Sequence, residues 1–122
     1  MSRPLPIVHQ VTRRQADGDR VVEELDLEFS NGERRRYHRV APVGNGAVIV
    51  VPMIDEHTAL LIREYAAGTL RYELGLVKGR IDDGETPEQA ANRELKEEAG
   101  YGARSLTVLR RLSLAPTYMG HE

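Results

Sequence analysis

The fold of this chain is decided by residues 79–101, GRIDDGETPEQAANRELKEEAGY, because this stretch marks both ends of a helix. Thr86 is a preferred N-cap residue, Pro87 suits the first helical position, and Gln89 can complete a capping box with Thr86. Gly100 stands where a helix commonly ends in a left-handed backbone conformation. The sequence therefore predicts a helix from Pro87 to the residue before Gly100.

The predicted helix carries three glutamates on one face. Glu94, Glu97 and Glu98 are spaced i, i+3 and i+4, so their carboxylates project together and repel one another unless a cation offsets their charge. Donors that are all oxygen favour a hard cation, and carboxylates that share their ion with water suit Mg²⁺ or Mn²⁺. Taken alone, the spacing is also open to a second interpretation, a solvated helix face rich in glutamate.

The motifs of several other functional classes are missing from the sequence. A calcium loop with Gly84 at its sixth position would place its twelfth ligand at Ala90, which has no carboxylate. There is no phosphate-binding P-loop, serine nucleophile elbow or HExxH zinc motif. The histidines lack the spacing of metal ligands; they are His9, His38, His57 and His121. The glutamate cluster is therefore the main candidate for chemistry.

The composition predicts a soluble globular protein, because 40% of the 122 residues are hydrophobic, 30% are charged and the net charge is -2. The absence of cysteine excludes disulfides and thiolate chemistry. No stretch resembles a secretory signal or a membrane span, so we expect a cytoplasmic protein with no membrane partner. The arginines at 34–36 are interpreted as solvated charge at a strand end, so no nucleic-acid partner is expected.

The rest of the sequence alternates between strand-like and turn-like segments. Residues 1–20 are polar and predict an arm followed by a turn. Residues 21–29 and 33–40 flank an Asn-Gly turn and predict a β-hairpin. Four further strands are expected, at residues 47–54, 59–65, 70–76 and 106–114. The first three of these are expected to form one mixed sheet.

Residues 79–101 also match the Nudix box, G-x5-E-x7-R-E-U-x-E-E-x-G-U, at every fixed residue; Tyr101 replaces the usual aliphatic side chain at the last position. The chain therefore resembles the Nudix hydrolase family, and Pro116 is placed as in the family's ADP-ribose and ADP-sugar pyrophosphatase branch. The resemblance implies an α/β fold, a Nudix α/β/α sandwich with a mixed sheet, preceded by the N-terminal β-hairpin.

The resemblance implies hydrolysis of the pyrophosphate bond in ADP-linked compounds, such as ADP-ribose, NADH or diadenosine polyphosphates, with release of AMP. The reaction would depend on Mg²⁺, which Mn²⁺ could replace. The alternative is a Nudix-fold module that binds an ADP-containing ligand without turnover. The three clustered glutamates favour the enzyme, since a pure binding module has no need of them.

The resemblance also assigns roles to residues of the box. The metal ligands would be the backbone carbonyl of Lys78 and the carboxylates of Glu85, Glu94, Glu97 and Glu98. The catalytic residues would be Glu94, Glu97 and Arg93. Glu97 would serve as a further ligand or as the general base, and Arg93 would hold the glutamates in place by ion pairing.

Substrate contacts are expected mainly outside the predicted helix. Arginine binds diphosphate oxygens through a two-pronged fork, and the available candidates are Arg39, Arg63 and Arg80. Pro116 and Glu122 are expected at the same substrate site. Tyr65 and Tyr118 could stack on adenine, while core packing is the other role open to them.

Two regions are expected along the chain. Residues 1–44 would form the N-terminal arm and hairpin, and residues 45–122 would form a partial Nudix domain, because the family's fold normally continues with further strands and a closing helix. The chain is thus expected to be a fragment. Relatives in the branch pair through such a hairpin, which implies a two-fold homodimer in which Arg39 reaches the neighbour's site.

Overall fold

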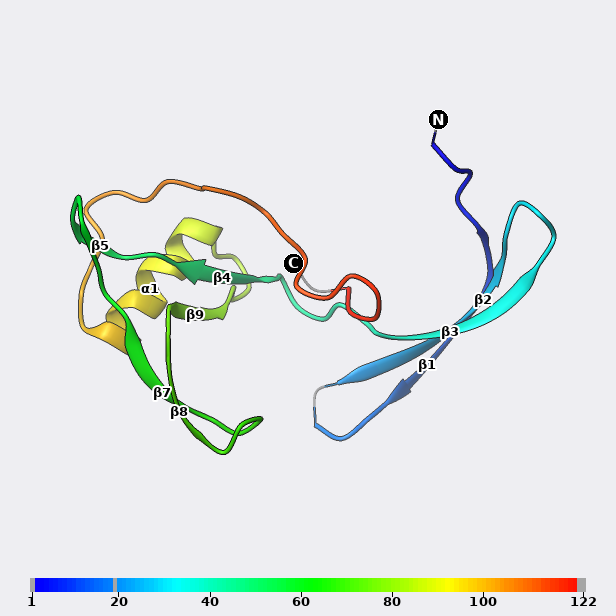
Figure 1. Ribbon diagram of the computed structural model, residues 1–122, viewed down its shortest axis with the longest axis horizontal. Helices are drawn as coiled ribbons and strands as arrows, with labels where there is room; N and C mark the ends of the chain where they lie inside the picture. Colours follow the sequence, from blue (N-terminus) through cyan, green and yellow to red (C-terminus); the bar gives the residue numbers. More distant parts are fainter. Residues whose placement is uncertain (1, 19, 121–122) are drawn as a thin grey trace. The chain divides into compact units, whose positions relative to one another are not determined.

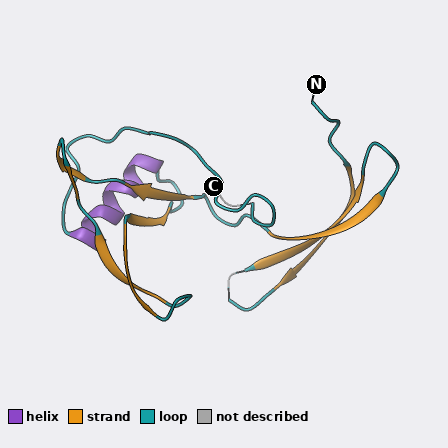
Figure 2. Cartoon of the chain, in the orientation of Figure 1, coloured by secondary structure: helices purple, strands orange, loops and turns teal. Residues whose placement is uncertain are grey.

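The computed structural model describes residues 2–18 and 20–120, and the chain divides into two compact units. The first unit contains the residues up to 43 together with the segment from 112 onward, and the second contains residues 44–111. Figures 1 and 2 show the strands and the helix that these residues form. Each unit has its own sheets and its own buried residues.

The first unit is built on a three-stranded antiparallel sheet in the order β1–β2–β3 (Figure 1). The strands are β1 at Ile7–Gln15, β2 at Val21–Glu28 and β3 at Arg34–Val40. Strands β2 and β3 confirm the predicted hairpin. At its turn the Asn31 side chain accepts a hydrogen bond from the Glu33 amide at 3.0 Å, and Gly32 has the left-handed φ of 84° that favours glycine.

Residues 7–15 form strand β1, where the sequence predicted only an arm followed by a turn over residues 1–20. The pairing of β1 with β2 shifts register between Val8 and Gln10, so His9 interrupts the two-residue alternation by which a strand is recognised in a sequence. Every residue of β1 is exposed, so the strand is stabilised by its backbone hydrogen bonds to β2 and not by burial. This strand depends on a pairing that the local sequence does not encode.

The second unit packs one helix against a pair of antiparallel strands. Helix α1 at Pro87–Ala99 contacts β4 at Ala47–Val50 and β9 at Val77–Arg80. Two further antiparallel pairs complete the unit: β5 at Met53–Asp55 with β6 at Thr58–Ala59, and β7 at Ile62–Ala66 with β8 at Arg71–Gly75.

Helix α1 confirms the predicted helix at both ends. The Gln89 amide donates to the Thr86 hydroxyl at 3.1 Å, and the Thr86 amide donates to the Gln89 side chain at 2.9 Å, so the capping box is complete. Gly100 has a φ of 76° and terminates the helix. Leu95, on the buried face, packs with Val50 and Val77 of the strands. The core therefore fixes which face of the helix is presented to solvent.

The strands of the second unit differ from those predicted. The expected strand 47–54 splits into β4 and β5 around Pro52, because proline has no amide hydrogen for a ladder. The expected strand 59–65 is divided between β6 and β7, the strand 70–76 shortens to β8, and β9 was not anticipated. Among the described residues these strands form separate antiparallel pairs rather than one mixed sheet.

Residues 106–114 form no strand in the described chain, although their apolar pattern predicts one. Val108, Leu109 and Leu114 are all exposed. A strand needs a neighbour for its backbone hydrogen bonds, and no described strand pairs with this segment. The prediction was wrong because it considered side chains and not the backbone partner.

The α/β class is confirmed. Of the expected α/β/α layers, the described part of the chain supplies α1 and the β4–β9 pair that it covers. Residues 2–18 and 20–120 form no helix with the length and apolar character needed to cross a bilayer.

Candidate functional site

The acidic face of α1 is organised around Arg93, whose side chain is 28% exposed. Its Nε and Nη2 donate to the two oxygens of Glu85 at 2.8 and 2.9 Å. Its Nη1 donates to Glu94 at 2.9 Å and, at 3.4 Å, to Glu97. Nη2 also donates to the backbone carbonyl of Arg80 at 2.9 Å. One arginine therefore connects three predicted site glutamates with the end of β9.

This cluster fixes the protonation state of Glu85. The hydrogen bonds from Arg93, and then the one from the Asp82 amide at 2.8 Å, lower the pKa of Glu85 from 4.5 to about 2. The hydrogen bonds to Glu85 and Glu94 raise the pKa of Arg93 above its usual range. Glu85 is therefore ionised at neutral pH and acts as a permanent counter-charge to Arg93.

Two glutamates of α1 reach the backbone of β9. The Glu94 carboxyl occupies the space beside Gly79 that a Cβ atom would fill, so a side chain at position 79 would collide with it. Glu98 Oε2 accepts a hydrogen bond from the Lys78 amide at 3.4 Å. The structure thus brings Glu98 to Lys78, whose carbonyl is the predicted ligand, and Glu94 to the next residue of β9.

The residues present fit a hard cation by their chemistry, since every predicted donor is an oxygen and Gly79 lets a carboxylate approach the β9 backbone. In this arrangement Arg93 satisfies the carboxylates of Glu85, Glu94 and Glu97. Within residues 2–18 and 20–120, no three acidic or histidine side chains are grouped so that they could hold one ion. The guanidinium group of Arg93 therefore balances the negative charge of these carboxylates.

The other predicted residues of the second unit lie on its strands. Arg80 ends β9, and its carbonyl accepts the hydrogen bond from Arg93. Arg63 is exposed in β7. Tyr65, also exposed in β7, packs edge to face against Tyr72 with ring centroids 5.5 Å apart. Substrate binding by these residues stays a prediction.

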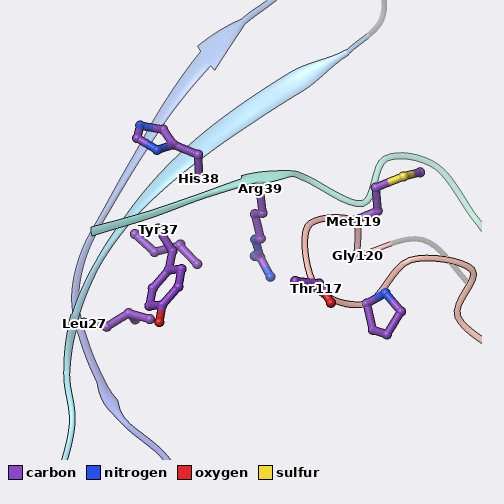
Figure 3. Close-up of a pocket in the computed structure, with 9 residues that line it drawn as sticks. Leu27, Tyr37, His38, Arg39, Thr117, Met119 and Gly120 are labelled. Carbon is purple, nitrogen blue, oxygen red and sulfur yellow. The ribbon is translucent and has the colours of Figure 1, made fainter. Parts of the chain in front are cut away.

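A cavity in the first unit brings together Arg39 and Pro116, two of the predicted substrate contacts. Its volume is about 310 Å³, and its walls come from β2, from β3 and from the segment 116–120. Figure 3 shows the Arg39 side chain projecting from β3 between Tyr37 and Thr117. A parallel bridge between Val40 and Met119 brings this segment to β3. Glu122, also predicted at the substrate site, lies outside the described residues.

A buried acid that was not predicted from the sequence holds Arg39. Glu23 of β2 is 1% exposed; its Oε2 lies 3.3 Å from Arg39 Nη2 and its Oε1 lies 3.6 Å from Arg13 Nε. Arg39 Nε is buried without a hydrogen-bond partner among the described residues. The alternation of residues in β2 could have indicated that Glu23 is buried, because Glu23 shares its face of the strand with Leu25 and Leu27.

Family models match most of the chain. The NUDIX domain model matches residues 45–121, and the model of the NudE-type Nudix hydrolase N-terminal domain matches residues 6–39. The first match contains α1 and the Arg93 cluster, and the second contains most of the three-stranded sheet.

Individual proteins match as well. The chain is 60% identical over 101 residues to the ADP compounds hydrolase NudE of Escherichia coli (strain K12), covering 83% of this chain and 54% of that protein. It is 31% identical over 93 residues to the ADP-ribose pyrophosphatase of Bacillus subtilis (strain 168), covering 76% and 49%. A crystal structure of an ADP compounds hydrolase superimposes with a TM-score of 0.88 at 51% identity, covering 98% of this chain and 64% of that one. The chain spans about half the length of these two curated relatives.

Proposed function

The chain belongs to the Nudix hydrolase family, and from this premise we propose that it acts as a Mg²⁺-dependent pyrophosphohydrolase of ADP-linked compounds. The proposed reaction cleaves the pyrophosphate bond of ADP-ribose, NADH or a diadenosine polyphosphate and releases AMP. The observation that carries the proposal is the cluster in which Arg93 gathers Glu85, Glu94 and Glu97. The names of the two curated relatives support ADP-linked compounds as the substrate class.

Nudix hydrolases in general use divalent metal ions. For this chain the proposed ion is Mg²⁺, with Mn²⁺ as a substitute. The proposed ligands are the Lys78 carbonyl and the carboxylates of Glu94 and Glu98, with Glu97 as a further ligand and Glu85 as an outer one. The contacts of Glu94 and Glu98 with the β9 backbone support this choice.

The bound ion would neutralise charge on the phosphate oxygens and lower the pKa of a bound water. The residues of the chain would supply positioning and proton transfer. Glu97 is the proposed base when it is not a ligand, since it is the most exposed carboxylate that Arg93 contacts within α1. Arg93 orients the glutamates, and Arg63 and Arg80 bind the diphosphate through bidentate hydrogen bonds.

Substrate binding in the first unit is proposed at the cavity that contains Arg39 and Pro116. Glu23 holds one Arg39 nitrogen, which orients the guanidinium, while 39% of the Arg39 side chain remains exposed. An oriented arginine fork beside an aromatic ring suits an anionic ligand with a planar group. Glu122 is proposed as a further substrate contact.

A homodimer formed through residues 1–44 is also proposed. Strand β1 is an edge of its sheet and exposes Ile7, Val8 and Val11, and an apolar edge strand favours pairing with another chain. We further propose a cytoplasmic location, with a small molecule as substrate and with neither nucleic acid nor membrane as partner.

Product analysis tests the proposed function. The purified protein is incubated with Mg²⁺ and, in separate reactions, with ADP-ribose, NADH and a diadenosine polyphosphate, and the nucleotides are separated by chromatography. Release of AMP that stops when Mg²⁺ is chelated is the expected result. Binding of these compounds without release of AMP would contradict the enzyme and favour a binding module.

A further inference from the structure

We infer that Asn45 is a positioning residue that holds the loop between β9 and α1, residues 81–86, so that Glu85 meets Arg93. The relevance of this role to catalysis rests on the proposed function. Its structural part stands on contacts within the second unit alone, and Asn45 lies well outside the box at 79–101.

The side chain of Asn45 binds this loop at two points. Its Nδ2 donates to Asp83 Oδ1 at 2.6 Å and to the backbone carbonyl of Ile81 at 3.4 Å. The first contact is charge-assisted, because the acceptor is a carboxylate, and such bonds are stronger than those between neutral groups. Asn45 therefore contacts two residues of a loop that is distant from it in sequence.

The backbone around Asn45 supports this contact. Gly44 and Gly46 flank it with φ values of 78° and 90°, a left-handed conformation that other residues rarely adopt, so the chain turns tightly at this point. The Gly46 carbonyl accepts a hydrogen bond from the Ile81 amide at 3.0 Å. The turn at residues 44–46 is thus joined to the loop by its backbone as well as by the Asn45 side chain.

The same loop is held from its other side by the box. Glu85 Oε1 accepts a hydrogen bond from the Asp82 amide at 2.8 Å, and the Glu85 amide donates to the Asp82 carbonyl at 3.1 Å. Arg93 donates two hydrogen bonds to the Glu85 carboxylate, and its Nη2 lies 3.4 Å from Asp82 Oδ2. The loop is therefore fixed between Asn45 and Arg93, and loss of the Asn45 side-chain contacts leaves it held by the helix and by the backbone hydrogen bond from Ile81 to Gly46.

The effect of Asn45 should be local rather than global. Asn45 and Asp83 are both exposed, and an exposed polar contact contributes little to the stability of a whole domain. A loop with few buried side chains opens by itself, at a free energy well below that of global unfolding. The expected signature is thus faster opening of residues 81–86 with an almost unchanged thermal midpoint.

Hydrogen exchange by NMR on the metal-free ¹⁵N-labelled protein tests this role. The readouts are the exchange rate of the Asp82 amide and the Nε–H signal of Arg93. Asn45→Ala removes the side-chain donor, and Asn45→Asp places a second carboxylate against Asp83. The combination of Asn45→Asp with Asp83→Asn restores an amide–carboxylate pair with its polarity reversed. Asn31→Ala, in the hairpin turn of the first unit, is the matched control.

The expected result is Asp82 exchange about tenfold faster in Asn45→Ala, and at least as fast in Asn45→Asp. In both variants the Arg93 signal broadens, the combined variant returns both readouts toward wild type, and Asn31→Ala changes neither. An unchanged exchange rate in Asn45→Ala, failure of the combined variant to restore it, or a thermal midpoint that falls in step with the exchange would overturn the inference. Because neither metal nor substrate is present, these outcomes are independent of whether the protein releases AMP.

Discussion

Glu85 and Arg93 meet through two parallel hydrogen bonds, from Nε and Nη2 of the arginine to the two carboxylate oxygens, at 2.8 and 2.9 Å. Glu85 belongs to the loop and Arg93 to the helix, so this pair couples the shape of one to the orientation of the other. The remaining nitrogen of Arg93 contacts Glu94 and Glu97. A change in the position of the Arg93 guanidinium would therefore also move the contacts of Glu94 and Glu97, two of the proposed metal ligands.

Replacement of Arg93 by lysine should raise the pKa of Glu85 from about 2 toward its ordinary value of 4.5. Lysine keeps the positive charge and loses the planar fork, which is the largest cause of the lowered pKa. Titration of the Glu85 carboxyl by ¹³C NMR measures the change. Arg110→Lys is the control, and an unaltered Glu85 titration in Arg93→Lys would show that charge alone is sufficient.

The Glu85–Arg93 pair should make stability depend on pH in the acidic range. The pKa of Glu85 is about 2 in the folded protein against an ordinary value of 4.5, so the ionised carboxyl stabilises the fold above pH 4.5 and loses this contribution as the pH falls to 2. Urea denaturation at a series of pH values measures the slope. Glu85→Gln should flatten the curve between pH 4.5 and 2; an equal slope in both proteins would assign the acid sensitivity to other groups.

Replacement of Gly79 by alanine should displace the Glu94 carboxyl, because the new Cβ would occupy the same space. The displacement should cost little stability, because the atoms in the way are the far end of a flexible side chain, but it moves a proposed metal ligand. Titration with Mn²⁺ followed by electron paramagnetic resonance gives the metal affinity, which should fall, and chemical denaturation gives the free energy of unfolding, which should change little. Gly75→Ala in β8 is the matched control, since no atom lies within 4 Å of its added Cβ, and equal effects of the two substitutions would refute the crowding at Gly79.

Glu98→Gln should lower Mg²⁺-dependent turnover by more than about tenfold, roughly 1.4 kcal/mol in the barrier, and leave the fold intact. Glutamine keeps the shape of the side chain and removes the charge that would hold the ion. Circular-dichroism melting checks the fold, and Glu88→Gln at the first turn of α1 is the control for loss of one helical carboxylate. A smaller decrease in turnover would remove Glu98 from the principal ligands.

Mg²⁺ should raise the thermal midpoint of the protein, because an ion that binds only the folded state stabilises it by mass action. The ion would also relieve the repulsion among Glu94, Glu97 and Glu98. Thermal unfolding with and without millimolar Mg²⁺ measures the shift, with Glu98→Gln expected to reduce it. An unchanged midpoint at saturating Mg²⁺ would favour the interpretation of a solvated helix face.

The helix of the site could be predicted in detail because its signals are local. Thr86, Gln89 and Gly100 each act within a few residues of the helix end that they stabilise, and each does so in the structure. Within the cluster only the Arg93–Glu97 contact follows from helix spacing, since these residues are four apart; Glu94 is next to Arg93 in sequence, and Glu85 reaches it from the loop. Sequence spacing alone did not show that Arg93 satisfies these carboxylates in place of an ion.

The elements that escaped prediction depend on contacts between distant residues. Strand β1 forms through pairing with β2, and the register shift at His9 breaks the alternation that would have indicated a strand in the sequence. The cavity beside Arg39 requires Met119 to bridge Val40, and no local pattern indicates that bridge. Asn45 was overlooked for the same reason, because its partner Asp83 is far along the chain.

The position of Glu23 between Arg13 and Arg39 governs which strand alignments are permitted. A shift of β1 by one residue can bring Arg14 opposite Glu23 in place of Arg13, but a shift of β3 by one residue would remove Arg39 from that face of the sheet. The carboxylate of Glu23 would then remain inside without that counter-charge, which is strongly unfavourable. One buried acid thus disfavours a misaligned β3, whereas the alignment of β1 is set by its backbone pairing with β2.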